Sequence, residues 1–257
     1  MKIISKVTTN FLKGSNEEPK EWPQILVLLS ASIAGFATGT LFSFPSPAIP
    51  KLIDGNYKFS MEEVSYLTVI PAIAMIFTTP IVCKLMDKIG RKRTLLMSGV
   101  YHITAWLFAG FSRTIYLFYV SRIFAGFADA TVFAVLPTYI AEVTTPKVRS
   151  LYGNTVVLAI FSGQFLVNCV GFYLTIPLTA FILLASPLLF LITFIFMPET
   201  PYYFIMVGDE KSAEKSLRRL RGLHDVQEEL KQLDSDVKRQ LSESVSAALS
   251  EVCYHIL

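Results

Sequence analysis

Charge is absent from a long part of this sequence. No Asp, Glu, Lys or Arg occurs between Arg149 and Glu199, so Ser150 to Pro198 form an uncharged run of 49 residues. A single helix of this length would measure about 73 Å, at ~1.5 Å per residue, whereas a bilayer core is ~30 Å thick and takes about 20 residues. The run therefore predicts two membrane spans with a turn near Thr175–Pro177. A water-soluble globular protein is excluded by the same run and by a mean hydropathy of +0.51.

Other scarce residues exclude further classes of protein. The three cysteines are too few and too scattered for a disulfide framework or a metal site: Cys83, Cys169 and Cys253. The three histidines form no recognisable catalytic or metal cluster, so we expect neither an enzyme nor a cofactor: His102, His224 and His255. We expect His102 to make a buried polar contact. The basic residues of the C-terminal tail are balanced by acids and lack interleaved aromatics, so no nucleic-acid partner is expected.

Hydropathy predicts six spans and three regions. The N-terminal residues 1–23 are polar and charged without a cleavage site, so they predict a cytoplasmic tail before a retained first span. Residues 24–200 are expected to form the transmembrane bundle, and residues 201–257 a cytoplasmic helical linker, because Asp209–Gln240 is dense in Glu, Lys, Arg and Leu. The six expected spans are Gln24–Phe44 (ended by Pro45, Pro47 and Pro50), Val64–Leu85, Thr94–Phe111, Ile115–Tyr139, Tyr152–Tyr173 and Ile176–Met197.

The placement of cations predicts the orientation in the membrane. Of the 23 lysines and arginines, nineteen fall on the side that carries both termini, and three fall on the other side: Lys51, Lys58 and Arg113. Because basic residues collect in cytoplasmic loops, both termini are expected in the cytoplasm, and the even number of spans agrees.

Two charged residues lie inside the fourth expected span. Arg122 and Asp129 are seven residues apart and therefore share one face of a helix. Charges at membrane depth are costly, so both are candidates for a pathway or gating role. Two alternatives stay open: Arg122 extends to the outer interface, or the two residues form a buried structural pair.

The cytoplasmic ends of the spans also carry charges of both signs. Asp87 ends the second span, and Gly90 and Arg91 follow it in a short basic turn. Glu142 and Arg149 lie after the fourth span, and Glu199 follows the sixth. Such acids and arginines can bridge helix ends, and an exposed pair contributes only ~0–1 kcal/mol, which suits a reversible gate. The plainer alternative is an ordinary set of interfacial charges.

Three residues are candidates for ligand binding. Gln164 lies in the middle of the fifth span, and Asn168 follows one turn later. A neutral amide both donates and accepts hydrogen bonds, which suits hydroxyl groups. From the residues alone, an interhelical polar contact remains the alternative. Phe36 could supply an aromatic wall for a ligand or simply pack between helices.

The order of these motifs resembles the sugar porters of the major facilitator superfamily. Asp87–Arg93 is similar to their D-x-x-G-R-R/K loop, and Arg122 to the arginine that opens their fourth helix. The P-x-Y-x-x-E…R element is matched by Pro137, Tyr139, Glu142 and Arg149, and the P-E-S/T-P element by Pro198–Pro201. Leu217–Gly222 is similar to the helix that follows, and the whole resemblance is greatest to the insect facilitated trehalose branch.

The resemblance implies an all-α polytopic membrane protein: the six-helix N-terminal half of a carrier bundle with a cytoplasmic helical tail. It implies alternating access for a sugar, with Gln164 contacting hydroxyls and a charge network of Asp87, Arg91, Glu142, Arg149 and Glu199. Ala37 stands where proton-coupled members carry an acid, which implies facilitated diffusion of trehalose or a hexose. The sequence departs from the pattern at Tyr202, where arginine is usual, and at Ser150, where glycine is usual.

Length is the larger departure from the resemblance. Sugar porters have twelve spans and this sequence holds six, so we expect a truncated product whose sugar cavity lacks one side. The partners expected are a sugar, the bilayer, and a missing C-terminal half or another carrier. Two alternatives remain: an interaction protein that pairs with full-length carriers without transporting, and a carrier for a different small solute.

Overall fold

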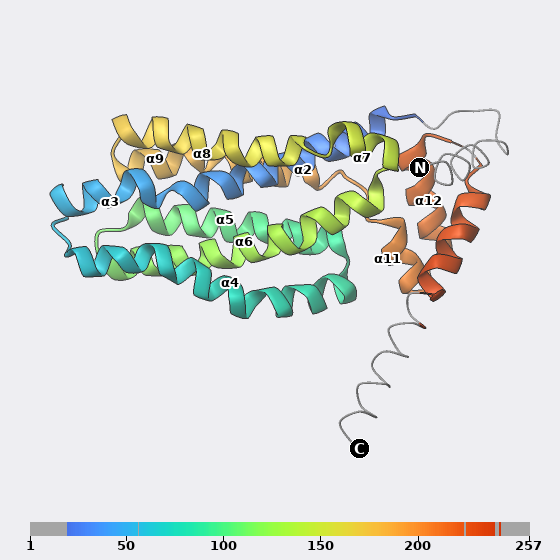
Figure 1. Cartoon of the computed structure of the whole chain (residues 1–257), viewed down its shortest axis with the longest axis horizontal. Coiled ribbons are helices and arrows are strands. Elements are labelled where there is room, and N and C mark those ends of the chain that lie inside the picture. The colour runs from blue at the N-terminus through green and yellow to red at the C-terminus, as the bar shows by residue number, and fades with distance from the viewer. Residues whose placement is uncertain (1–19, 56, 224, 240–241, 243–257) are drawn as a thin grey trace, which may run out of the picture. The chain divides into compact units, whose positions relative to one another are not determined.

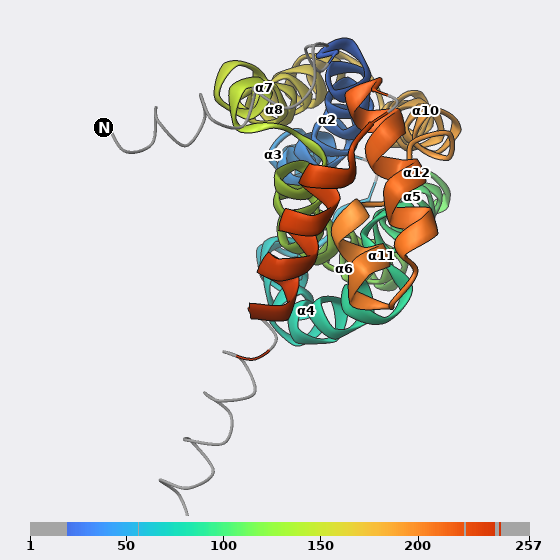
Figure 2. The same cartoon turned by 90° about the vertical axis from the view of Figure 1, so that its right-hand side faces the viewer.

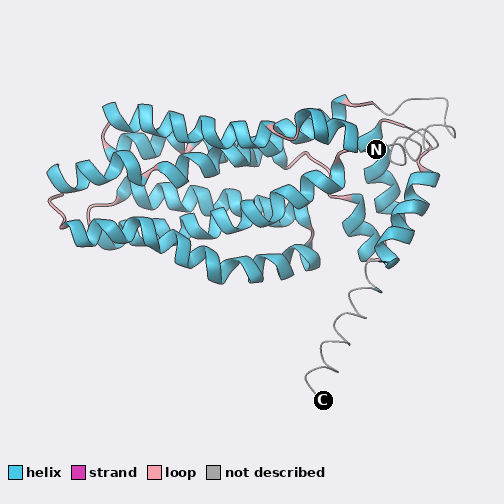
Figure 3. Ribbon diagram, in the orientation of Figure 1, coloured by secondary structure: helices cyan, strands magenta, loops and turns pink. Residues whose placement is uncertain are grey.

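The computed structural model describes residues 20–55, 57–223, 225–239 and 242. Within these residues the chain is built of helices and loops, without strands (Figure 3). Two compact units are present: Gln24–Glu199 forms one, and the described residues on either side of it form the other. The helices of the first unit, shown in Figure 1, are α2 (Trp22–Ser43), α3 (Pro45–Asp54), α4 (Met61–Ile89), α5 (Arg91–Phe111), α6 (Ile115–Val143), α7 (Pro146–Tyr152), α8 (Thr155–Tyr173), α9 (Ile176–Leu183) and α10 (Ala185–Phe194).

Six helical segments of the described chain are long and apolar enough to cross a membrane, which confirms the six expected spans. The turn expected near Thr175–Pro177 is also confirmed, because α8 ends at Tyr173 and α9 begins at Ile176. The helices run beyond the apolar cores that hydropathy marks. For example, α4 begins at Met61, where Ser60 and Glu63 form a reciprocal capping box. The charged ends of the spans are therefore helical.

The prolines after the first span begin a new helix. As expected, α2 ends just before Pro45, but α3 starts at that proline after a single turn residue, Phe44. Proline is tolerated in the first turn of a helix, where its missing N–H would have no partner. Pro50 lies further inside α3. The first membrane-crossing segment thus extends from Trp22 to Asp54, with a break at Phe44.

The helix α6 lies at the centre of the bundle. It packs along both α4 and α5, and α5 in turn packs against α9 and α10. Figure 2, a view turned by 90° from Figure 1, shows α6 between α4 and the pair α2–α8. This packing buries more than half of the residues of α6, among them Arg122 and Asp129.

Glycine lets α2 and α8 approach closely. A Cβ added to Gly39 would lie 2.0 Å from the Ile160 carbonyl oxygen, and one added to Gly163 would lie 2.3 Å from the Phe36 carbonyl oxygen. Neither space admits a side chain. Small residues at helix interfaces are typical of membrane bundles, where association depends on close van der Waals packing.

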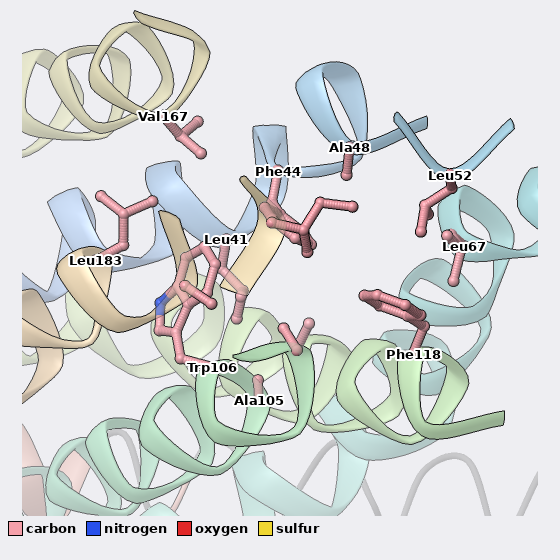
Figure 4. Close-up of a cluster of buried hydrophobic side chains, with 14 of the residues drawn as sticks. Leu41, Phe44, Ala48, Leu52, Leu67, Ala105, Trp106, Phe118, Val167 and Leu183 are labelled. Atoms are coloured by element: carbon pink, nitrogen blue, oxygen red, sulfur yellow. The ribbon is translucent and has the colours of Figure 1, made fainter. Parts of the chain in front are cut away.

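A hydrophobic core fills the half of the bundle that includes α3 (Figure 4). Trp106 of α5 is fully buried, and its ring meets Phe44 edge-on at a centroid distance of 5.2 Å. Phe118 of α6 contacts Tyr57 and Phe59 in the same T-shaped manner. These contacts hold the loop after α3 against the start of α6.

The second unit contains α11 (Pro201–Met206), α12 (Glu210–Arg221) and a helical segment over 227–239. Asp209 caps α12 by accepting a hydrogen bond from the Ser212 amide at 3.1 Å. Hydrogen bonds from the Ser212 side chain and from this amide lower the pKa of the Asp209 carboxyl. Arg221, at the end of α12, binds Glu229 through two nitrogens. Most of the described residues of the expected linker thus lie in these three helical segments. Residues 1–19 of the expected N-terminal tail and most of 240–257 lie outside the described residues.

Candidate functional site

Charged residues meet at one end of the bundle, where α4 ends and α5 begins. The Arg91 side chain is only 3% exposed and lies between two carboxylates. Its Nη2 is 3.2 Å from Asp87 Oδ1 of α4, and its Nε is 3.1 Å from Glu142 Oε2 of α6. A third bond goes from Nη1 to the Met86 carbonyl at 3.3 Å. One guanidinium thus joins the ends of three helices.

Gly90 makes this arrangement possible. It separates α4 from α5 and has a φ of 99°, a value that L side chains rarely adopt. Its N–H donates to the Met86 carbonyl, and its carbonyl accepts from the Thr94 hydroxyl at 2.7 Å. The chain therefore reverses within one residue, which sets Arg91 directly beside Asp87.

The end of the sixth span joins the same region. Glu199 accepts a hydrogen bond from the Lys92 amide at 2.9 Å, and the buried Tyr139 hydroxyl donates to the Pro198 carbonyl at 2.7 Å. The Lys92 ammonium also reaches the Ile195 carbonyl. Glu199 therefore contacts the start of α5 through the main chain.

Arg149 lies on α7, and its Nη1 donates to the Ala141 carbonyl near the end of α6, at 3.3 Å. At the same junction the Gln24 side chain of α2 accepts a 2.7 Å bond from the Thr145 amide. Of the five residues of the expected network, three are thus joined by charge: Asp87, Arg91 and Glu142. Glu199 accepts from the Lys92 amide, and Arg149 donates to the Ala141 carbonyl.

Arg122 lies inside the bundle and not at its surface. It is 2% exposed, and its Nη1 donates to the Leu41 carbonyl of α2 at 3.1 Å. The guanidinium carbon lies 5.0 Å from the centre of the Phe44 ring. A carbonyl and an aromatic face both stabilise a cation in an apolar surrounding. This buried position differs from the alternative in which the Arg122 side chain extends to the membrane interface.

Asp129 is also buried, at 3% exposure, near the middle of α6. Its Oδ1 has no hydrogen-bond partner among the residues that the structure describes, and no ion pair in the same part of the chain joins it to Arg122. Seven residues along a helix correspond to about 10 Å. Arg122 and Asp129 therefore lie on the same face of α6 without direct contact, and their opposite charges partly offset one another.

Gln164 and Asn168 project from one side of α8. The Asn168 amide donates to the Ser43 hydroxyl of α2 at 2.9 Å and to the Gln164 carbonyl at 2.8 Å. The Gln164 side chain is half-buried, and no hydrogen bond to it occurs among the described residues. A free amide at membrane depth is costly in hydrocarbon, so this side chain suits a water-filled cavity or a polar ligand.

Phe36 lies apart from these two amides. It lines an apolar groove between α2, α8 and the α9–α10 segment, and neither Gln164 nor Asn168 is among the lining residues. The structure therefore brings together two of the three candidate ligand residues.

Lys51 makes a contact that could not be predicted from the sequence pattern. Its ammonium, on α3, donates to the carbonyls of Gly171, Phe172 and Leu174 at the end of α8. A cation at a helix C-terminus satisfies carbonyls that lack partners within the helix. The available signal in the sequence was a lone lysine after the first span, on the same side of the predicted bundle as the uncharged turn between the fifth and sixth spans.

Six apolar crossings, buried charges in the central helix and a charged cluster at one end define a polytopic α-helical membrane protein. A sequence model of the "Sugar (and other) transporter" family matches residues 2–255. The chain belongs to this family.

Among curated relatives, the facilitated trehalose transporter Tret1 of Drosophila grimshawi is 30% identical over 235 residues, which cover 89% of this chain and 25% of that protein. The Tret1 protein of Apis mellifera ligustica is 29% identical over 233 residues, covering 86% of this chain and 45% of that protein. The chain thus spans between a quarter and a half of the length of these relatives.

Solved structures show the same fold. The proton:xylose symporter XylE of the major facilitator superfamily, bound to 6-bromo-6-deoxy-D-glucose, superimposes with a TM-score of 0.74 at 18% identity, covering 84% of this chain and 53% of that one. An inward open conformation of XylE from E. coli gives a TM-score of 0.71 at 19% identity, covering 85% and 56%. The first unit therefore has the fold of about half of these proteins.

Proposed function

We propose that this chain serves carbohydrate transport, as one half of a carrier that moves trehalose or a hexose by facilitated diffusion and alternating access. Family membership supports the class of protein, and the names of the matched relatives support the substrate. The observation that carries the proposal is Gln164, a half-buried amide without a partner in the described chain, on a helix whose neighbouring polar residue is already engaged. Asn168 is proposed to hold the α8 backbone at that point against α2.

Passive transport is supported by Ala37. This residue is buried in α2 and cannot titrate, at the position where the resemblance places the acid of proton-coupled members. The cluster of Asp87, Arg91 and Glu142 is proposed to hold one conformation of the carrier and to break when the carrier opens at that end. We further propose that this end faces the cytoplasm, since nineteen of the 23 cations lie on its side of the spans. That orientation places both termini in the cytoplasm, and we propose the plasma membrane as the location.

The test is uptake of labelled trehalose and glucose into vesicles that contain the chain, alone and together with a full-length carrier of the family. Gln164→Ala should weaken uptake by about tenfold, because the loss of one hydrogen bond to the sugar is worth ~1–1.5 kcal/mol. Ser162→Ala is the matched control: its hydroxyl donates to the Leu158 carbonyl of its own helix, on the other side of α8. Unchanged sugar uptake in Gln164→Ala would instead favour a carrier for a different solute.

A second candidate is an interaction protein that pairs with full-length carriers and does not itself transport. It is favoured by the exposed apolar face of α4, where Ile76 and Phe77 are each 71% exposed. Co-purification with a full-length carrier, together with uptake no greater than in empty vesicles, would establish this second function and exclude the first.

A further inference from the structure

The helix α12 presents a row of cations at its surface. Lys211, Lys215 and Arg218 are exposed, and their spacing of four and three residues places them on one side of the helix. Within the part of the chain that the structure describes, the ammonium groups of Lys211 and Lys215 make no hydrogen bond or ion pair. Two cations one turn apart are therefore available to an anionic partner.

The acids near this row are already engaged. Glu214 accepts hydrogen bonds from the Arg218 guanidinium at 2.6 Å and from a side-chain amide of the next helical segment at 2.9 Å. Asp209, which interacts electrostatically with Lys211, caps the start of the helix, and Glu210 interacts with a lysine of the next segment. The acids that balance the cations in number thus leave the two lysines without a direct partner in the described chain.

The apolar side of α12 is used within its own unit. Leu217 and Leu220 are buried, and Ala213 packs in a core with Ile205 of α11 and Val237. Figure 2 shows α11 and α12 beside one another. Side chains two positions apart on a helix project about 200° apart, so the cations face away from this core. The exposed side of α12 therefore offers charge and no apolar surface for insertion into lipid.

A small hollow of about 230 Å³ lies along the same side of α12. It is lined by Lys211, Glu214, Lys215 and Arg218. This volume is below the ~300–1,000 Å³ of ordinary small-molecule pockets. Lysine binds phosphate as a point charge, and two lysines one turn apart, with Cβ atoms about 5–6 Å from one another, can hold a phosphate and a second anionic group. The hollow therefore fits a phosphate headgroup better than a whole metabolite.

The chain keeps α12 near the bilayer. Glu199 ends the first unit, and α11 takes six of the eleven residues that lead from it to Glu210, the first residue of α12. A segment of this make-up spans at most about 27 Å. The headgroups next to the end of the sixth span are thus the phosphates within reach of the helix.

We propose that the side of α12 formed by Lys211 and Lys215 binds the headgroup of an acidic phospholipid such as phosphatidylserine. The cytoplasmic leaflet of a cell membrane carries such lipids, so in the cell this inference rests on the orientation proposed above. Binding of this kind holds the second unit against the membrane surface through charge alone.

The experiment uses the full chain in nanodiscs of phosphatidylcholine, with or without a minor fraction of phosphatidylserine. An amine-reactive acetylating reagent modifies exposed lysines, and mass spectrometry gives the rate at each one. With phosphatidylserine present, Lys211 and Lys215 should react several-fold more slowly, and high salt should restore their rates because it screens exposed charges. Lys231, exposed on the next helical segment, is the internal control for the general effect of a negative surface on lysine reactivity.

A pair of double variants measures the affinity. Lys211→Gln combined with Lys215→Gln should weaken phosphatidylserine binding to the purified chain by about tenfold in native mass spectrometry, since each lysine contributes separately to binding at an anionic surface. Phosphatidylcholine binding should stay the same. Lys231→Gln combined with Lys238→Gln removes the same charge from the neighbouring exposed segment and should leave both affinities unchanged.

Four results would overturn the proposal. Equal slowing at Lys231 would mean a general surface potential, and unchanged rates at Lys211 and Lys215 would mean that no lipid binds there. Full protection by inorganic phosphate in nanodiscs without phosphatidylserine would mean a site for a free anion. Stronger protection by a soluble acidic peptide than by phosphatidylserine would mean a protein partner. None of these readouts depends on sugar uptake, so this proposal and the proposed transport function fail separately.

Discussion

The helices α4 and α6 have the same length of 29 residues and lie against one another, yet they occupy different surroundings. In the most apolar stretch of α6, 61% of the residues are buried, whereas the corresponding share in α4 is 11%. The middle of α4 instead presents large apolar side chains at its surface, among them Ile76 and Phe77, each 71% exposed. Both helices read as membrane spans, but one is a core element and the other a surface element.

The difference teaches what hydropathy measures and what it omits. Apolar composition indicates that a helix is removed from water, but it does not distinguish contact with lipid from contact with protein. Charged residues make that distinction, because a charge in a span must face the protein or a water-filled cavity. Arg122 and Asp129 of α6 are both buried, and no Asp, Glu, Lys or Arg lies between Glu63 and Lys84 of α4. The charged residues within a span therefore identify α6 as the central helix.

Removal of Arg122 is expected to have the largest effect. Arg122→Ala leaves the Leu41 carbonyl without its donor and the buried Asp129 without a balancing charge. The loss of a charge-assisted hydrogen bond is worth ~1.5–3 kcal/mol and the loss of the desolvated cation–π contact with Phe44 ~2 kcal/mol, so the free energy of unfolding should fall by about 3–5 kcal/mol. Thermal and denaturant unfolding of the purified chain in detergent micelles measures the change.

Arg113→Ala is the matched control, since Arg113 is exposed in the loop just before α6. Its stability should change by no more than about 0.5 kcal/mol. Equal effects of the two alanine variants would mean that Arg122 reaches the interface, and α6 would lose its distinction from α4.

A pair of phenylalanines tests the comparison without charge. Phe118 of α6 is 1% exposed in the hydrophobic core, and Phe77 of α4 is 71% exposed. Phe118→Ala should destabilise the chain by about 3–5 kcal/mol through the cavity that it leaves. Phe77→Ala should cost no more than about 0.5 kcal/mol, because nothing in the bundle covers that ring.

The same unfolding measurements decide the outcome, and a second set in the presence of a full-length carrier sharpens it. If Phe77→Ala weakens binding to that carrier while leaving the isolated chain unchanged, the exposed face of α4 is a protein contact. A large loss in the isolated chain would contradict the surface position of α4.

Much of this architecture could be predicted from the sequence, because each signal had a direct physical cause. The uncharged run is too long for one crossing, so it fixed two spans and their turn, and Thr175 lies at the break between α8 and α9. The helices extend beyond the apolar cores of the spans because charged residues are tolerated at helix ends. Arg91, for example, is the first residue of α5 and contacts acids of two other helices.

The rest depends on contacts that lie far apart in the chain. The Lys51 ammonium meets carbonyls some 120 residues away, and main-chain acceptors leave no mark in a sequence. Phe36 and Gln164 both looked like ligand residues, but their separation depends on which way α2 and α8 turn their faces. That orientation follows from close approach at Gly39 and Gly163, a matter of packing between helices.

The smallest expected changes in stability come from the two acids that share one cation, one on α4 and one on α6. Arg91 binds Asp87 at the end of α4, which is 50% exposed, and Glu142 at the end of α6, which is 13% exposed. Glu142→Gln removes a charge from a buried guanidinium and should cost about 1–3 kcal/mol. Asp87→Asn removes a solvent-screened charge and should cost about 0–1 kcal/mol.

Added salt should narrow the difference in stability between wild type and Asp87→Asn. It should leave the loss of stability in Glu142→Gln almost unchanged, because buried pairs are screened less. Should the two variants prove equally costly and equally sensitive to salt, the end of α4 would be as enclosed as the end of α6, and the contrast between the helices would be confined to their middle sections.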